Sequence, residues 1–193
     1  MPSPPPDRGG FLLDVRVGVG PTIAYPSSRA AWLVPVTLGF GWRFAGGYRL
    51  VAVIEPSAGD LSDLAYALDP SAPEQPSNCG AAGCGFHLVL GVEAARTFER
   101  HPWRPWLGIL LGLEGLDVGD GAQTESWFGG VVRLTGGLPL LRTWQLEIGV
   151  FASAELGVWT DHEVEAGGVT TALAVGHPVH GAVTAGLRVA WEP

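Results

Sequence analysis

Apolar residues recur at every second position along most of this chain, and this alternation restricts its fold more than any other feature of the sequence. Between Trp144 and Trp159, the even positions are all apolar, whereas the odd positions include Gln145, Glu147 and Glu155. Successive side chains of a β-strand point to opposite faces, so segments of about ten residues with this pattern predict strands with two different faces. The sequence contains eight such segments, at residues 11–20, 31–44, 47–55, 85–96, 104–116, 126–135, 144–159 and 179–191, with residues 169–175 as an upward extension of the last one.

The connections between these segments alternate in length. The short connections are expected at 45–47, 97–103 and 136–143, and the longer ones at 21–30, 56–84, 117–125 and 160–178. Long loops at one end and short turns at the other are typical of a membrane barrel, whose closure also removes exposed sheet edges. We therefore predict an all-β, eight-stranded antiparallel up-and-down transmembrane β-barrel. It forms a single domain over residues 11–191, with the long loop 56–84, after a Pro/Gly-rich tail at residues 1–10.

The composition leaves little material for a water-facing coat. Only 16% of the residues are charged and all 11 basic residues are Arg, whereas an average soluble domain is about 25% charged. The second face of the strands carries Gly, Ala and Thr beside isolated charges of both signs, which suits the crowded interior of a small barrel. Charges buried there must neutralise one another. We predict that the apolar rows face lipid and that the lumen holds a polar network of Asp14, Arg16, Arg43, Arg49, Glu93, Glu114, Arg133, Glu147, Glu155 and Arg188.

Aromatic side chains gather at both ends of the expected strands, as in the aromatic girdles that line the two membrane interfaces. We assign Trp42, Phe44, Tyr48, Trp103, Trp144 and Trp191 to the short-turn end. We assign Tyr25, Trp32, Phe86, Trp127 and Trp159 to the long-loop end, although Trp127 and Trp159 share the parity of the lumen face.

Charges also separate by end. The expected long loops hold Arg29 against nine acidic residues, which are Asp60, Asp63, Asp69, Glu74, Asp120, Glu125, Asp161, Glu163 and Glu165. Seven arginines lie toward the other end, which are Arg43, Arg49, Arg96, Arg100, Arg104, Arg142 and Arg188. One hypothesis is an acidic outer rim that binds divalent cations or bridges through them to the phosphates of lipopolysaccharide. The net charge of −8 argues against nucleic acid as a partner.

Cysteine and histidine residues supply the candidates for a disulfide or a metal site. Cys79 and Cys84 lie close together in NCGAAGC and are expected to form a local disulfide in an exposed loop. The alternative, a metal site that His87 completes, lacks an apparent fourth ligand. His177 and His180 flank a Pro-Val pair, which favours a loop pair over a metal site.

These patterns resemble the small outer-membrane β-barrels of Gram-negative bacteria, in the style of OmpA, OmpX and OmpW. The resemblance covers residues 11–191 and rests on the strand pattern, the loop rhythm and the closing GLRVAWEP. Members commonly end on an aromatic residue, whereas Glu192 and Pro193 follow Trp191 here. The resemblance implies the fold and a location in the bacterial outer membrane. The opening MPSPPPDRGG lacks the apolar stretch of a secretory signal, so we interpret the numbering as that of a mature form or a piece of the protein.

No catalytic or cofactor motif stands out, so we expect no enzyme activity and no cofactor. The leading hypothesis is a membrane barrel with a structural or surface-interaction role. One alternative is a conduit or binder for small apolar molecules. Another is a lipid-modifying enzyme built on Ser153 with Glu155 or Thr184 with His180. The last is a soluble, lipocalin-like ligand carrier with its apolar face inward.

Overall fold

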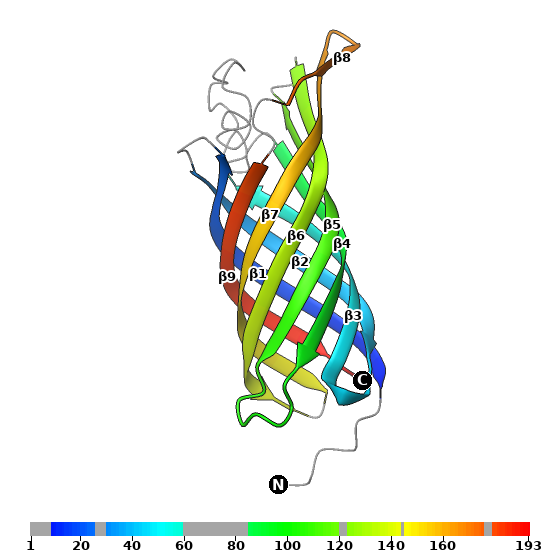
Figure 1. The fold of residues 1–193 in the computed structure, drawn as a ribbon, viewed down its shortest axis with the longest axis vertical. Coiled ribbons are helices and arrows are strands. Elements are labelled where there is room, and N and C mark those ends of the chain that lie inside the picture. Colours follow the sequence, from blue (N-terminus) through cyan, green and yellow to red (C-terminus); the bar gives the residue numbers. More distant parts are fainter. Residues whose placement is uncertain (1–8, 26–29, 60–84, 120–122, 144, 176–178) are drawn as a thin grey trace.

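The fold, seen in a computed structural model, is a long antiparallel barrel (Figure 1). The structure describes residues 9–25, 30–59, 85–119, 123–143, 145–175 and 179–193. Its strands are β1 (Gly10–Tyr25), β2 (Ala30–Arg43), β3 (Tyr48–Gly59), β4 (Gly85–Thr97), β5 (Trp106–Gly119), β6 (Gln123–Arg142), β7 (Leu146–Ala166), β8 (Val169–Leu173) and β9 (Val179–Trp191). A single 3₁₀ turn, η1 (Ala45–Gly47), is the one helical element among the described residues.

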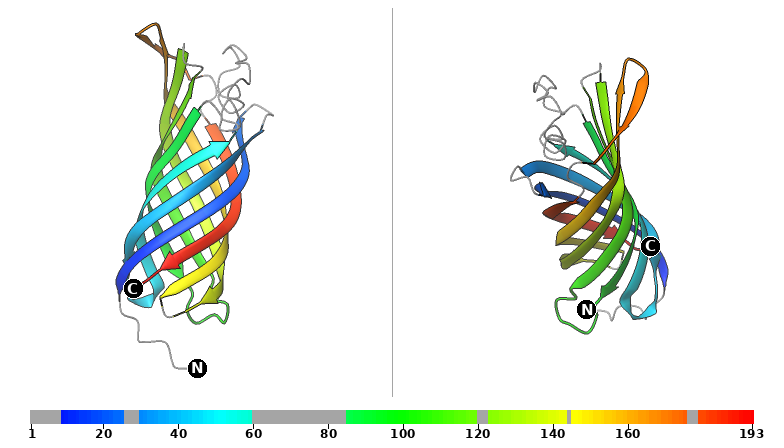
Figure 2. Two further views of the ribbon diagram at one scale, coloured as in Figure 1. Left: turned by 180° about the vertical axis from the view of Figure 1, so that it is seen from behind. Right: turned by 45° about the horizontal axis from the view of Figure 1, so that its top comes forward.

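Eight of the nine strands close into a ring. Each pairs with its neighbour in the order β6-β5-β4-β3-β2-β1-β9-β7, and β6 pairs with β7 to complete the circle. All of these pairings are antiparallel. They join strands that are consecutive in the chain, apart from β7 and β9, which are separated by β8, and β1 and β9, which are its two ends. The start of β1 and the end of β9 lie at the same end as the short turns (Figures 1 and 2). The predicted up-and-down barrel is therefore confirmed.

Each predicted segment lies within or overlaps one strand, but β6 and β7 are longer than predicted. The expected connection at 136–143 is wrong, because β6 continues to Arg142 and pairs with β7 down to Glu147. Pro139 fits this strand because the register shifts beside it, between Pro139 and Leu141. At the other end, β5 reaches Gly119 and β6 begins at Gln123, so most of the expected connection at 117–125 is also strand.

The segment 169–175 does extend the last strand upward. β9 pairs with β7 as far as Val158, and β8 takes over the same edge of β7 from His162 onward. Gly167 and Gly168 have φ values of 59° and 79°, and these left-handed conformations suit the tight turn between β7 and β8. The upper parts of β6 and β7, together with β8, thus form a flap that rises above the ring (Figure 2), and the end of β5 pairs with β6 along the same stretch.

A β-bulge at Thr160 changes which side chains of β7 point inward. Gly129 pairs with Trp159 and Phe128 with Asp161, so Thr160 has no partner in the β6–β7 ladder. The hydroxyl of Thr160 donates a hydrogen bond to the carbonyl oxygen of Phe128, 3.2 Å away. Because one extra residue inverts the alternation, Trp159 and His162 are both buried.

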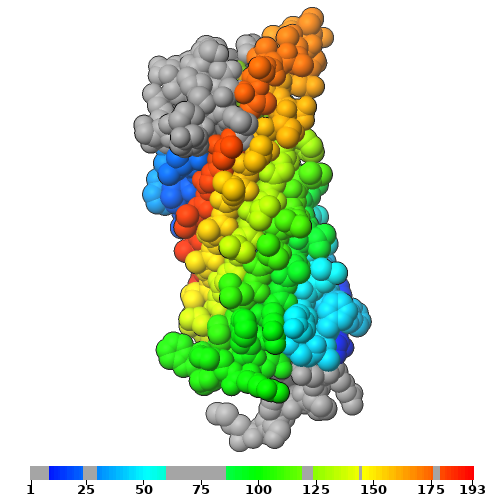
Figure 3. Space-filling model, viewed as in Figure 1, coloured from blue at the N-terminus to red at the C-terminus, as the bar shows by residue number. Residues whose placement is uncertain are grey.

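The exterior of the ring is apolar. The interior holds charged side chains together with a buried apolar cluster of Leu12, Val51, Val53, Val89, Leu110, Val131 and Ala190. Leu111 is 61% exposed and its cross-strand neighbours Val92 and Val132 are 51% and 43% exposed. The other large exposed apolar side chains include Val17, Val19, Val34, Phe40, Leu50, Ile54, Leu90, Leu107, Ile109, Leu113, Leu134, Leu156, Val183 and Leu187. Adjacent strands lie against one another as diagonal bands on this surface (Figure 3). No helix in the part of the chain that the structure describes is long and apolar enough to cross a membrane.

The aromatic side chains divide between the two faces. Trp42, Phe44, Tyr48, Trp103 and Trp191 are exposed near the short-turn end, and Trp32 and Phe86 near the other. Trp127 and Trp159 are buried inside the ring, so their assignment to the outer aromatic belt is wrong. Their positions in the alternating pattern had already placed both residues on the lumen face. Trp144 and the side chain of Tyr25 lie outside the described residues.

Candidate functional site

Side chains of opposite charge line the interior in two clusters. The lower cluster consists of Asp14, Arg16, Arg49, Glu93, Glu147 and Arg188. The upper cluster consists of Glu55, His87, Glu114, Arg133, Glu155 and His180. Strand parity directs all of these side chains inward, because each lies on the opposite face from the exposed apolar rows.

In the lower cluster, Arg16 joins strands on different sides of the ring. Its guanidinium lies 2.6 Å from the Glu93 carboxylate on β4 and 3.1 Å from Asp14 on its own strand. Arg188 on β9 pairs with Asp14 at 2.8 Å and also with Glu147 on β7. Arg16, Glu93 and Arg188 are at most 2% exposed. A water-filled passage beside them would leave them accessible, so the interior is packed at this level.

The lower cluster is organised around the indole of Trp106. The guanidiniums of Arg16, Arg49 and Arg188 lie 4.9, 4.8 and 4.8 Å from its ring centroid. Arginine favours such stacking because its guanidinium is planar and weakly hydrated. The three guanidiniums therefore pack against the same indole. The three carboxylates that balance their charge lie in the same part of the interior.

In the upper cluster, Arg133 on β6 binds two carboxylates. Its side chain donates to Glu55 on β3 at 2.6 Å and to Glu155 on β7 at 2.7 Å. Thr37 also donates to Glu55. These contacts fix Glu55 and Glu155 on one side of the upper cluster.

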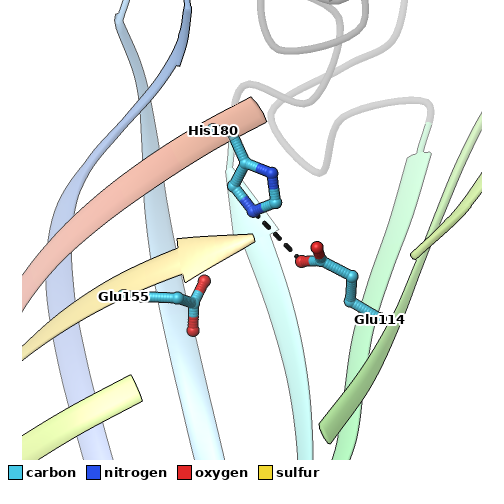
Figure 4. Close-up of side chains that lie close together, drawn as sticks. All are labelled: Glu114, Glu155 and His180. Carbon is cyan, nitrogen blue, oxygen red and sulfur yellow. Dashed lines mark ion pairs between the residues drawn. The ribbon is translucent and has the colours of Figure 1, made fainter. Parts of the chain in front are cut away.

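The remaining members of the upper cluster are two histidines and a carboxylate. Nε2 of His180 lies 3.1 Å from the Glu114 carboxylate, and Nε2 of His87 lies 3.8 Å from the same oxygen. Glu155 projects from β7 toward this pair (Figure 4). One potential ligand atom from each of Glu114, Glu155 and His180 lies within 4.8 Å of the other two. The arrangement places two carboxylates and an imidazole around a common point inside the barrel.

Two neighbours on β7 shape this part of the interior. The Trp159 indole stacks on the His180 ring, with centroids 5.0 Å apart, and meets His87 edge-on at 6.5 Å. Gly157 pairs with His180 across the β7–β9 ladder. A Cβ atom at position 157 would overlap both the His180 imidazole and the Glu114 carboxylate, so glycine supplies the space in which they meet.

Above the upper cluster lies an apolar cap. It contains Ala31, Leu33, Leu116, Val118, Trp127 and Trp159. His162 stacks on Trp127 with ring centroids 4.5 Å apart and lies 3.7 Å from the Glu125 carboxylate. Glu125 is therefore an interior residue, whereas the sequence suggested that it belonged to an exposed rim.

Replacement of Gly157 by alanine tests this packing. Overpacking of a tight interior typically costs about 1–3 kcal/mol, so Gly157→Ala is expected to lower the free energy of unfolding by that amount. Urea titration of the folded barrel, followed by tryptophan fluorescence, measures the effect. Gly130→Ala is the matched control, because a Cβ there meets nothing closer than 3.9 Å. Equal stability of the two variants would contradict the described packing.

The ten residues that the sequence predicted for the polar network of the lumen differ in their burial and location. Asp14, Arg16, Arg49, Glu93, Glu114, Arg133 and Arg188 are buried, and Glu147 and Glu155 are partly buried. Arg43 lies at the lower end of β2, where it pairs with Glu99 and Glu192 instead of joining either cluster. Cys79 and Cys84, with their expected disulfide, lie outside the described residues, as does His177.

The suggested catalytic pairs do not form a triad in the described part of the chain. Ser153 faces Thr184 across the β7–β9 ladder, and His180 pairs with Glu114 instead of with either hydroxyl. Several interior residues were absent from the sequence-derived network, which are Glu55, His87, Trp106, His162 and His180. Parity within their strands could have identified all except His162, whose position depends on the bulge.

Comparison with known proteins identifies the fold. No family model matches the chain, and no curated protein matches it. The crystal structure of Neisserial surface protein A is similar, with a TM-score of 0.58 and 14% sequence identity. The match covers 95% of this chain and 99% of that one. At this identity the likeness concerns the fold alone, and it shows that the chain adopts the same barrel architecture as Neisserial surface protein A.

Proposed function

We propose that this protein is a β-barrel of the bacterial outer membrane with a structural or surface-interaction role. The observation that carries the proposal is the distribution of side chains. Leu111 and its apolar neighbours are exposed outward, whereas Arg16, Glu93 and Arg188 are buried within. Such an exterior is unfavourable in water but is well matched to lipid hydrocarbon. A soluble ligand carrier needs the opposite arrangement.

The packed interior favours this role over that of a water-filled conduit. The lower cluster fills the ring with side chains that are almost inaccessible to water, and the apolar cap covers the upper cluster. A barrel of this kind presents its function at its surface, where the flap of β6, β7 and β8 rises above the ring (Figure 2). The likeness of the fold to that of Neisserial surface protein A supports a surface role for this barrel.

The flap also supports part of the proposed acidic rim. Asp161, Glu163 and Glu165 on β7 are exposed there. Asp60, Asp63, Asp69, Glu74 and Asp120 belong to the same proposal but lie outside the described residues. Carboxylates at this height suit divalent cations that bridge to the phosphates of lipopolysaccharide.

Lipid contact of the exterior can be measured by fluorescence quenching. The folded chain is reconstituted into vesicles whose acyl chains carry bromine, which quenches tryptophans in contact with them. We expect strong quenching that diminishes in the double variant Trp32→Phe, Trp42→Phe, because both side chains are exposed. Trp106→Phe is the matched control. Because Trp106 is 2% exposed, its removal should not reduce the fraction of the tryptophan fluorescence that the bromine quenches.

Two further observations separate the alternatives. A heat-modifiable band after extraction in detergent is expected for the membrane barrel. A protein that stays monomeric in detergent-free buffer would exclude that placement and favour a soluble carrier. Steady ion conductance in planar bilayers would instead favour a conduit.

A further inference from the structure

The two interior clusters differ in their balance of charge. In the lower cluster, the three carboxylates of Asp14, Glu93 and Glu147 meet three guanidiniums, those of Arg16, Arg49 and Arg188. In the upper cluster, the three carboxylates of Glu55, Glu114 and Glu155 meet the guanidinium of Arg133. With neutral histidines, the described residues of the upper cluster therefore carry two negative charges that no cation offsets. Uncompensated charge is very costly in a dry interior.

The deficit is concentrated at Glu114. Its side chain is fully buried, and neither carboxylate oxygen accepts a hydrogen bond of good geometry from the residues that the structure describes. In the same region, Nδ1 of His87, Nδ1 of His180 and Nε1 of Trp159 are buried and have no hydrogen-bond partner among the described residues. Buried polar atoms normally have a hydrogen-bond or ionic partner. A cation beside Glu114 would be the partner of its carboxylate and would restore the charge balance.

We propose that Glu114, Glu155 and His180 bind a divalent transition-metal ion of the Zn²⁺ class inside the barrel, with His87 as the fourth ligand. Ligand atoms from the first three residues already lie within 4.8 Å of one another. Zinc–ligand bonds of about 2.0–2.2 Å require ligand atoms about 3.5 Å apart, so the side chains close in by roughly 1 Å. Ca²⁺ and Mg²⁺ prefer oxygen ligands alone, whereas imidazole with carboxylate suits Zn²⁺.

The surroundings of this site position its ligands. Trp159 stacks on the imidazole of His180, and Gly157 leaves the space that His180 and Glu114 share. Arg133 donates a hydrogen bond to Glu155 at 2.7 Å. Supporting contacts of this kind orient ligand side chains and contribute to metal affinity. A divalent ion also offsets the two excess negative charges, which a single monovalent cation would not.

Metal content of the refolded barrel tests the proposal. The full chain is refolded from urea into detergent with Zn²⁺ present, so that access through a closed barrel is not required. Excess metal is removed by gel filtration, and zinc is measured by mass spectrometry on the heat-modifiable fraction. We expect about one equivalent per chain. Refolding with Co²⁺ should give the visible absorption of a site with nitrogen and oxygen ligands.

Variants distinguish this site from adventitious binding. Glu114→Gln and His180→Asn should each lower the affinity for Zn²⁺ by 100-fold or more, and His87→Gln by at least tenfold. His101→Asn is the matched control and should leave the zinc content unchanged. His101 is exposed on the turn between β4 and β5, and this turn lies at the opposite end of the barrel (Figure 1). Zinc content equal in wild type and Glu114→Gln, or absent from folded wild type, would overturn the proposal.

Discussion

Replacing Arg16 by methionine is expected to lower the free energy of unfolding by about 3–5 kcal/mol, the usual cost of removing one partner from a buried ion pair. Arg16 pairs with Glu93 at 2.6 Å, and both side chains are nearly inaccessible to water. Without Arg16, Glu93 loses its direct ion-pair partner and keeps only an electrostatic attraction to Arg49, with which it forms no ion pair among the described residues. Urea unfolding in detergent or vesicles measures the loss.

Two variants show whether the loss comes from the charge. The double variant Arg16→Met, Glu93→Gln removes one charge of each sign, which leaves the lower cluster balanced, and should recover more than half of the lost stability. Arg142→Met is the matched control, because Arg142 is exposed and lies 4.0 Å from Glu147. Exposed pairs contribute about 0–1 kcal/mol. A double variant as unstable as Arg16→Met would show that packing of the long side chain dominates.

Replacing Leu111 by arginine is expected to cost about 2–4 kcal/mol, the penalty for a guanidinium on the lipid face near the bilayer midplane. Leu111 lies in the middle of β5 and is flanked on the exterior by Val92 and Val132. Water is absent at that depth, so the charge must extend toward the headgroups or thin the bilayer around it. Urea titration of the barrel in lipid vesicles, with tryptophan fluorescence as the signal, measures this cost.

The control for this prediction is an arginine at a position that lies far from the bilayer midplane. Thr124→Arg places the same side chain on an exposed site at the top of β6, where the expected cost is about 0–1 kcal/mol. If Leu111→Arg and Thr124→Arg were equally stable, the apolar exterior would not lie in hydrocarbon. The comparison therefore tests the membrane placement independently of fluorescence quenching.

Parity explains why much of the fold follows from the sequence. In β2, for example, Trp32, Val34 and Phe40 lie on one face of the strand, and the structure exposes all three. The tight turn expected at residues 45–47 is η1, where Gly46 and Gly47 have φ values of 81° and 80°. Low charge together with two-faced strands was enough to place the apolar rows outside.

The candidate site could be predicted less completely, because it depends on distances between strands. Parity indicates that Glu114 and His180 face inward, but their sequence positions do not show that β5 and β9 bring them within 3.1 Å. The bulge at Thr160 inverts the alternation in β7, and no glycine or proline marks it in the sequence. His162 was missed for this reason.

The ion pairs inside the barrel join positions that are far apart in the chain. Arg16 meets Glu93 over 77 residues, Arg133 meets Glu55 over 78, and Arg188 meets Asp14 over 174. A partly assembled hairpin cannot form these contacts and would bring bare charges to hydrocarbon. For the membrane barrel proposed above, insertion is therefore expected to be coupled to circularisation. The polypeptide gains little from entering the bilayer strand by strand, and its first and last strands must pair before the assembled barrel becomes favourable in lipid.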